Sequence, residues 1–194
     1  MAVVASQMPA LLGRSAFDLF AENGFGNVNL DQVAARAGVT KGSLYWHYKN
    51  KQALVLAACN HYYTRWFRAV NADLASVVDP EARLRKTLEF SVHSCVIDRK
   101  NRIFTTGIFM LMQEDAAVKA SWQQFYSSVR EFYVGLVMAG VANGKLATRD
   151  AHQAVDLMLE AIEGIKLRAS FEPHIAEPSE QAALVDGLWR ILND

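Results

Sequence analysis

The chain has 194 residues, of which 52% are hydrophobic and 21% charged, and its formal net charge is zero. A chain of this length and hydrophobic content can fill a core, and the composition excludes a chain that is disordered throughout or coated with basic charge. The charge is unevenly distributed, because residues 1–56 carry five basic and three acidic side chains and the remainder carries 15 and 17. This weak excess of basic charge near the N-terminus favours a local contact with phosphate.

The sequence shows neither a secretion signal nor a membrane span. Its start lacks the basic region of a signal peptide, and the longest apolar run, residues 103–112, is interrupted and far shorter than the ~20 residues that a span needs. Cys59, Cys95 and the five histidines are scattered, without metal-ligand spacing, so neither a metal nor a cofactor is expected. The two cysteines suit small buried side chains in a reducing compartment. We therefore expect a soluble, cytoplasmic protein.

Apolar residues recur at intervals of three and four along the chain, which predicts helices and no strands. The first predicted helix covers residues 9–23, because Pro9 suits a first helical position and Gly24 suits a left-handed stop. The second covers residues 30–37, with Asn29 as its N-cap and Gln32 completing a capping box. The third, about residues 40–46, begins at another N-cap residue, Thr40.

Longer helices follow. They are predicted after Asn50 up to about residue 78, and over residues 80–96, 103–113, 116–143, 148–171 and 179 to the end, with Asp79, Thr148 and Ser179 as caps and a loop at 98–101. The predicted fold is all-α, with about nine helices. An N-terminal three-helix domain, residues 1–56, is joined through the fourth helix to a larger helical domain, residues 57–194.

The two short helices predict a helix-turn-helix, because Gly38 permits positive φ in the turn and Val39 can fill the angle between the helices. The N-terminus of the second of these helices presents free amides that suit a phosphate. With Val33, Ala34 and Leu44 forming the small core, the residues around its outer end are Lys41, Gly42, Ser43, Tyr45, Trp46 and His47. Lys41 supplies charge, the Tyr45 hydroxyl suits phosphate, and the rings of Trp46 and His47 can reach base edges or sugar.

The residues around this motif resemble a known family. Residues 8–56 are similar to the TetR family of bacterial repressors, in the run 20–25, the run 29–34 and the run Ala37-Gly38-Val39-Thr40-Lys41-Gly42-Ser43-Leu44-Tyr45-Trp46-His47-Tyr48-Lys49-Asn50-Lys51. A weaker similarity follows at residues 144–146 and 159–164. There are two departures: residues 1–13 contain no Lys or Arg where the family is often basic, and Gln52 stands where an acidic residue is common.

The resemblance implies a homodimer that binds a pseudo-palindromic operator in double-stranded DNA, usually repressing until a small molecule binds the second domain. It also implies that Tyr48 lies in the core. The residues that it places at or near DNA are Asn29, Thr40, Lys41, Ser43, Tyr45, Trp46, His47 and Lys51.

The second domain is rich in aromatic and Met side chains beyond what a thin bundle needs, which favours an apolar pocket for a small hydrophobic ligand. The predicted lining is Trp66, Phe90, His93, Phe109, Trp122, Phe125 and Met158, although each could be an ordinary core residue. The last two helices are apolar on more than one side, which predicts a two-fold four-helix seam between copies. Its predicted members are Val155, Leu159, Ile162, Leu184, Leu188 and Ile191.

These observations predict a DNA-binding transcriptional regulator, a repressor that a small apolar or aromatic ligand releases from its operator. An activator, or a regulator without a ligand, stays open. The rivals from other classes are a helical enzyme and a protein-binding adaptor. We expect no enzyme, since the sequence has no phosphate-binding glycine loop, nucleophile elbow or HExxH motif. DNA binding that weakens with added salt separates a regulator from both rivals.

Overall fold

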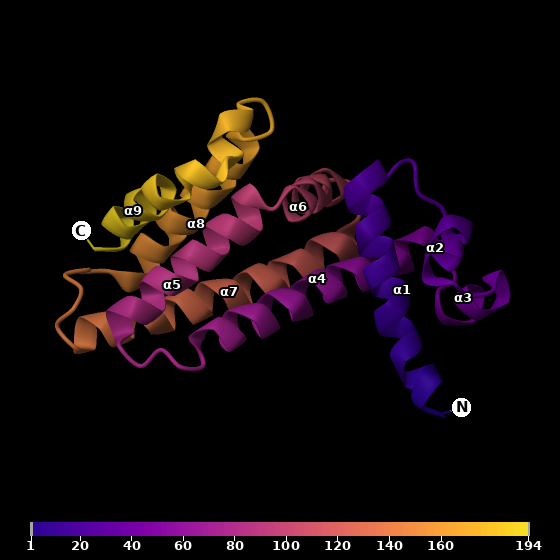
Figure 1. The fold of residues 1–194 in the computed structure, drawn as a ribbon, viewed down its shortest axis with the longest axis horizontal. Helices are drawn as coiled ribbons and strands as arrows, with labels where there is room; N and C mark the ends of the chain where they lie inside the picture. The colour runs from indigo at the N-terminus through magenta and orange to yellow at the C-terminus, as the bar shows by residue number, and fades with distance from the viewer. Residues whose placement is uncertain (1, 194) are drawn as a thin grey trace. The chain divides into compact units, whose positions relative to one another are not determined.

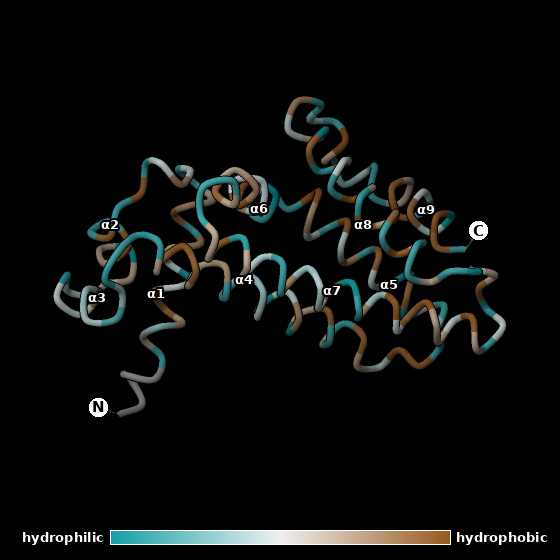
Figure 2. The backbone as a smooth tube through the Cα atoms, turned by 180° about the vertical axis from the view of Figure 1, so that it is seen from behind, coloured by the Kyte–Doolittle hydropathy of each residue, from teal (hydrophilic) through white to brown (hydrophobic). Residues whose placement is uncertain are grey.

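The computed structural model describes the backbone of residues 2–193 and the side chains of residues 7–193. Over these residues the fold contains no strand (Figure 1). The helices are α1 (Ala2–Asn23), α2 (Leu30–Ala37), α3 (Lys41–His47), α4 (Lys51–Leu74), α5 (Pro80–Val92), α6 (Arg99–Leu111), α7 (Ala116–Ala142), α8 (Ala151–Arg168) and α9 (Gln181–Leu192). Colours alternate between hydrophobic and hydrophilic along the helices in Figure 2, as expected of amphipathic helices. No helix in the described part of the chain is long and apolar enough to cross a membrane.

The chain divides into two compact units. Unit 1 holds the residues up to Phe67 together with Ile103–Gln124, and unit 2 holds Arg68–Arg102 and the residues from Phe125 onward. The predicted domain boundary after residue 56 therefore falls inside unit 1. Parts of α4, α6 and α7 belong to the same compact unit as the predicted helix-turn-helix.

An aromatic cluster holds unit 1 together. The ring of Phe17 in α1 lies 4.8 Å from that of Phe104 in α6 and 6.2 Å from that of Tyr62 in α4. Phe25, in the connection between α1 and α2, stacks on Phe20 at 4.7 Å and lies 5.4 Å from Phe104. Such pairs add to the free energy that burial alone supplies, so α6 forms part of the core beneath the N-terminal helices.

In unit 2, α9 packs against both α5 and α8. The Arg85 guanidinium of α5 lies 4.0 Å from the ring centre of Trp189 in α9, and Gln181 donates a hydrogen bond to the Glu89 carbonyl at 3.1 Å. The fully buried Tyr133 of α7 donates to the hydroxyl of Ser91 at 2.6 Å. Because a buried hydroxyl without a partner is costly, this bond fixes the register of α7 against α5.

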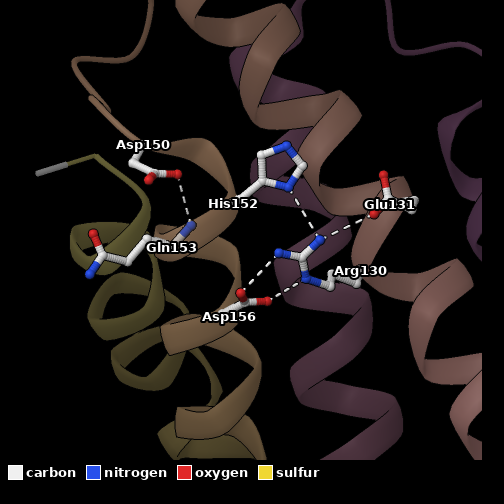
Figure 3. A network of polar contacts seen from close by, with 6 residues as sticks. All are labelled: Arg130, Glu131, Asp150, His152, Gln153 and Asp156. Atoms are coloured by element: carbon white, nitrogen blue, oxygen red, sulfur yellow. Dashed lines mark hydrogen bonds and ion pairs between the residues drawn. The ribbon is translucent and has the colours of Figure 1, made fainter.

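A polar network joins α7 to α8 at the surface of unit 2 (Figure 3). The Arg130 guanidinium donates to both carboxylate oxygens of Asp156, at 2.5 and 2.9 Å. It also lies 3.1 Å from Glu131 and 3.2 Å from Nδ1 of His152. Hydrogen bonding to Arg130 lowers the pKa of Asp156, so both groups stay ionised at neutral pH.

Several predicted helix ends were wrong. Helix α1 begins at Ala2 and contains Pro9 in its interior, where the missing N–H leaves one backbone hydrogen bond of the helix unmade. Helix α6 begins at Arg99 inside the predicted loop, where Asp98 accepts from the backbone N–H of Asn101. Helix α5 passes into a π-helical turn at His93–Ile97 before α6 begins.

The caps of the last two helices also differ from the prediction. Asp150 caps α8 by accepting from the backbone N–H of Gln153 at 3.0 Å. The predicted cap, Thr148, instead donates its hydroxyl to the Leu192 carbonyl. Helix α9 begins without a side-chain cap, after a 3-10 turn at Pro178–Glu180 that includes the predicted cap Ser179. Local sequence does not separate these choices, since Thr, Ser and Asp all suit an N-cap.

Candidate nucleic-acid interface

The turn between α2 and α3 is built by its local sequence. Asn29 and Gln32 form a reciprocal capping box at the start of α2, with bonds of 2.9 and 2.8 Å. Gly38 ends α2 with φ 68°, a left-handed conformation that favours glycine. The Thr40 hydroxyl then accepts from the backbone N–H of Ser43 at 3.1 Å and starts α3. The predicted caps and turn of the helix-turn-helix are thus confirmed.

One face of α3 is buried and the other is exposed. Leu44 is buried, as are Val33 and Ala34 of α2. Tyr45 is 44% exposed and Trp46 is 75% exposed, and the Trp46 ring stands edge-on to His47 with ring centres 4.5 Å apart. A large exposed indole has no role in the core, so this face suits an intermolecular contact.

The predicted DNA-contact residues are brought together at the start of α2, along α3 and at the start of α4. Lys41 and Gly42 are exposed, and Ser43 and His47 are half-buried. Lys51 lies at the first position of α4, and its ammonium donates to the Gly26 carbonyl at 3.3 Å. Asn29 and Thr40 already use their side-chain oxygens as helix caps. Direct contact of all these residues with DNA stays a prediction.

Two ion pairs lie among the first three helices. The Lys41 ammonium lies 2.5 Å from Oδ2 of Asp31 in α2, and Arg36 in α2 pairs with Glu22 in α1. The hydrogen bond to Asp31 raises the pKa of Lys41, which keeps its positive charge at neutral pH. Sequence reasoning missed the Asp31 contact, because the two residues come together only when α3 turns back on α2.

At Tyr48 and Gln52 the structure can be compared with what the family resemblance implies. Tyr48 is half-buried rather than fully buried, and its hydroxyl lies 3.5 Å from the Pro9 carbonyl. Burial raises the pKa of Tyr48. Gln52 donates to the Asp115 carboxylate at 2.8 Å, so an amide at this position links α4 to the start of α7 within unit 1. The bond to the Val118 backbone N–H, with that to Gln52, lowers the pKa of Asp115.

The predicted ligand-lining residues divide between the two units. Trp66, Phe109 and Trp122 belong to unit 1, where Phe109 and Trp122 meet edge-on at 5.5 Å. Phe90, His93, Phe125 and Met158 belong to unit 2. Met158 is buried in the core, whereas the side chain of His93 is exposed at the start of the π-helical turn. The assignment of a ligand site to this set stays a prediction.

A buried charge in unit 2 was also missed. Lys166 is only 2% exposed and pairs with Glu163 one turn earlier in α8. Its spacing from Leu159 and Ile162 puts it on the inward stripe of the helix, a signal that could have revealed it. Within the described residues, no group of three His, Cys, Asp or Glu side chains is arranged to hold a metal ion.

The predicted dimer residues fall mostly inside one chain. Val155, Leu159, Ile162 and Leu188 are buried in the single chain, and Leu184 and Ile191 are half-buried. The four buried residues form the core between helices rather than a surface. The exposed apolar side chains of α8 are Leu157 and Leu167, with Phe171 exposed just after the helix. A seam formed by α8 and α9 would therefore use these outward residues.

These features define a class: a helix-turn-helix DNA-binding protein with further helices that follow the binding domain in the chain. A family model described as "Bacterial regulatory proteins, tetR family" matches residues 14–58. The HTH-type transcriptional regulator TtgR of Pseudomonas putida is 27% identical over 83% of this chain and 79% of its own length. The uncharacterized regulator YerO of Bacillus subtilis is 39% identical, but over only 25% of this chain and 17% of its own length. The transcriptional activator FasR of Mycolicibacterium smegmatis is 32% identical over 39% of this chain and 34% of its own length.

Solved structures share the whole fold. A TetR transcription regulator from Haloarcula marismortui has a TM-score of 0.84 at 16% identity, covering 96% of this chain and 97% of its own. A regulator from Saccharomonospora viridis, in complex with choline, has a TM-score of 0.82 at 16% identity, covering 96% of each chain. Residues 14–58 thus match the DNA-binding domain of the TetR family, and the whole chain shares the fold of a TetR-family regulator. The protein is a DNA-binding regulator, and the named relatives are regulators rather than enzymes.

Proposed function

We propose that this regulator binds a pseudo-palindromic operator as a homodimer, represses the adjoining genes, and leaves the operator when a small apolar or aromatic molecule binds. The observation that carries the DNA contact is the exposed face of α3. Lys41 and Trp46 stand outward there while Leu44 holds the helix to the core. A charged side chain at the start of a short helix and a planar ring on its exposed face suit phosphate and base edges in a major groove.

The proposed dimer rests on the outward face of α8. Leu157, Gly164 and Leu167 are exposed at intervals of seven and three, so they follow one face of the helix. Two exposed leucine side chains on this face favour a partner, and a two-fold axis beside α8 makes the same face meet its copy. A dimer also presents two recognition helices, which must enter successive major grooves about 34 Å apart.

The proposed ligand site draws on the apolar and buried polar groups of unit 2. Phe125 and Met158 are buried there, and Lys166 is a buried charge of the same unit that suits a polar end of a ligand. Two structures with this fold contain choline and stearoyl-CoA. These precedents support a small-molecule effector, here one that is mainly apolar.

Two experiments test this function. Selection of genomic fragments by the purified protein, followed by footprinting, should yield an inverted repeat whose binding weakens steeply with salt. No bound sequence at any salt concentration would contradict operator binding. A reporter gene behind the recovered site decides between repression and the activation for which FasR is named.

The ligand is tested by a thermal-shift screen of hydrophobic compounds. Each hit should weaken operator binding, and by linkage the operator should weaken binding of the hit by the same factor. Hits that stabilise the protein without changing operator affinity would contradict the release mechanism and leave the DNA contact intact.

A further inference from the structure

Lys41 is already engaged before any DNA arrives. Its ammonium lies 2.5 Å from the carboxylate of Asp31, and both side chains face solvent, with 68% and 45% of their surfaces exposed. Asp31 stands in the first turn of α2 and Lys41 is the first residue of α3. The pair therefore joins the two helices of the motif on the surface proposed to meet DNA.

We propose that Asp31 competes with the DNA backbone for Lys41 and so lowers the affinity of this regulator for all DNA. The inference rests on the proposed contact between Lys41 and phosphate. On binding DNA, the Lys41 ammonium gives up its bond to the Asp31 carboxylate and forms one to a phosphate. The free energy gained from this contact is therefore only the difference between the two interactions. Before DNA binds, the Asp31 carboxylate thus occupies the place on Lys41 that a DNA phosphate would take.

The competition remains even when Lys41 contacts the Asp31 carboxylate and a DNA phosphate at the same time. One ammonium can donate to a carboxylate and a phosphate together, but the two acceptors then lie within about twice a hydrogen-bond length of each other. Two negative charges at that separation repel, and the repulsion is added to the free energy of the complex. An acid that oriented Lys41 would carry the same repulsion, so orientation would favour binding only if its gain exceeded this repulsion.

The competition acts equally on every sequence. A phosphate contact carries no base information, so its weakening lowers operator and unrelated DNA binding by the same factor. The ratio of the two affinities, set by residues such as Trp46, is unchanged. An exposed ion pair is weak, which limits the effect to about two- to fivefold in affinity.

The decisive experiment is a double-mutant cycle on the full chain. Asp31→Asn, Lys41→Gln and the double variant are titrated, at several salt concentrations, against the operator recovered by selection and an unrelated duplex of equal length. Asp31→Asn should bind both duplexes about two- to fivefold more tightly. Its affinity should fall more steeply with salt, since a freed Lys41 releases a further counterion from the backbone. In the Lys41→Gln background the Asp31 substitution should lose most of its effect.

A matched control removes the other acidic partner of the N-terminal helices. Glu22→Gln breaks the ion pair with Arg36 and deletes one negative charge, so it measures the effect of losing an acid and its ion pair at a site that does not involve Lys41. Thermal unfolding of each variant checks that α2 survives the loss of an acid from its first turn. A gain from Asp31→Asn that exceeds the gain from Glu22→Gln and vanishes with Lys41→Gln supports the proposal.

Other outcomes overturn it. Weaker binding by Asp31→Asn would make the acid a helpful orienting group, and an equal gain in the Lys41→Gln background would make it a general repulsive charge. If Lys41→Gln weakens binding but Asp31→Asn changes nothing, only the competition fails. If Lys41→Gln itself binds like the parent, the proposed placement of α3 on DNA fails as well.

Discussion

A Cβ atom added to Gly107 would lie 2.5 Å from Cε2 and 2.7 Å from Cδ2 of Phe25. The ring of Phe25, in the connection leading to α2, thus rests directly on the backbone of α6. This contact exists only because residue 107 has no side chain. It ties the connection before the helix-turn-helix to a helix that lies more than 60 residues later in the sequence.

Gly107→Ala should therefore destabilise the protein by about 1–3 kcal/mol, because the added methyl group overpacks a filled site. Chemical denaturation measures the change. The matched control is Gly135→Ala in α7, where no atom beyond the adjoining backbone of the helix lies within 4 Å of the added carbon. That variant should be neutral or stabilising by up to about 1 kcal/mol. Equal stability of the two variants would contradict the close contact.

Substitutions on α3 should separate affinity from sequence preference. Lys41→Ala and Tyr45→Phe should each weaken binding to all DNA by about 1–2 kcal/mol, since lost phosphate contacts carry no base information. Ser43→Ala and Trp46→Ala should instead change which operator variants are preferred. Binding to a panel of single-base operator variants distinguishes the two groups. Parental binding by Lys41→Ala at several salt concentrations would show that this end of α3 does not meet DNA.

Charges placed on the two sides of the α8 and α9 pair should have different outcomes. Leu188 is 1% exposed in the single chain, so Leu188→Glu buries an unpaired charge and should unfold unit 2. Leu167 is 58% exposed, so Leu167→Glu should leave the chain folded but monomeric. Light scattering and circular dichroism give the mass and the helix content. A folded dimer for Leu167→Glu would move the proposed seam away from this face.

The Arg130–Asp156 pair predicts a pH-dependent contribution to stability. Because Arg130 lowers the pKa of Asp156, the pair stabilises the folded chain above the ordinary Asp pKa of about 4 and loses this effect as pH falls through the lowered value. Asp156→Asn should thus lower the melting temperature at pH 7, and the gap from the parent should narrow below pH ~4. A gap that is constant with pH would mean that the carboxylate charge contributes nothing.

The two cysteines should differ in reactivity. Burial raises the pKa of the Cys59 thiol to about 12, so almost no thiolate is present at pH 8. Iodoacetamide should modify Cys59 only after unfolding, whereas the half-buried Cys95 is the internal comparison. Peptide mass spectrometry reads both sites. Rapid labelling of Cys59 in the folded protein would place it at an accessible surface.

The parts of the structure that sequence predicted depend on near neighbours. The caps at Asn29 and Thr40 and the turn at Gly38 are set within three or four residues, so their residue types suffice. The inward stripe of α8 was recognised, but both sides of the helix carry apolar residues. Periodicity alone therefore assigned Val155 and Ile162 to a seam when they lie in the core.

The parts that sequence missed depend on distant contacts. The ion pair between Asp31 and Lys41, and the contact of Phe25 with Gly107, require the chain to fold back before the residues meet. The inclusion of residues 103–124 in unit 1 is of the same kind. No local propensity records which helix will cover which core.

Wherever the chain crosses from one unit to the other, the crossing lies inside a helix: in α4, in α6 and in α7. The last crossing is between Gln124 and Phe125. On the ribosome, the N-terminal helices emerge first but the unit that contains them lacks part of its core until residue 124 has been made. A nascent or truncated chain that ends before α7 leaves apolar surface exposed, which favours aggregation and degradation. Such a fragment would not accumulate and occupy operators, so a premature stop codon in this gene should behave as a simple loss of function and be recessive to an intact copy.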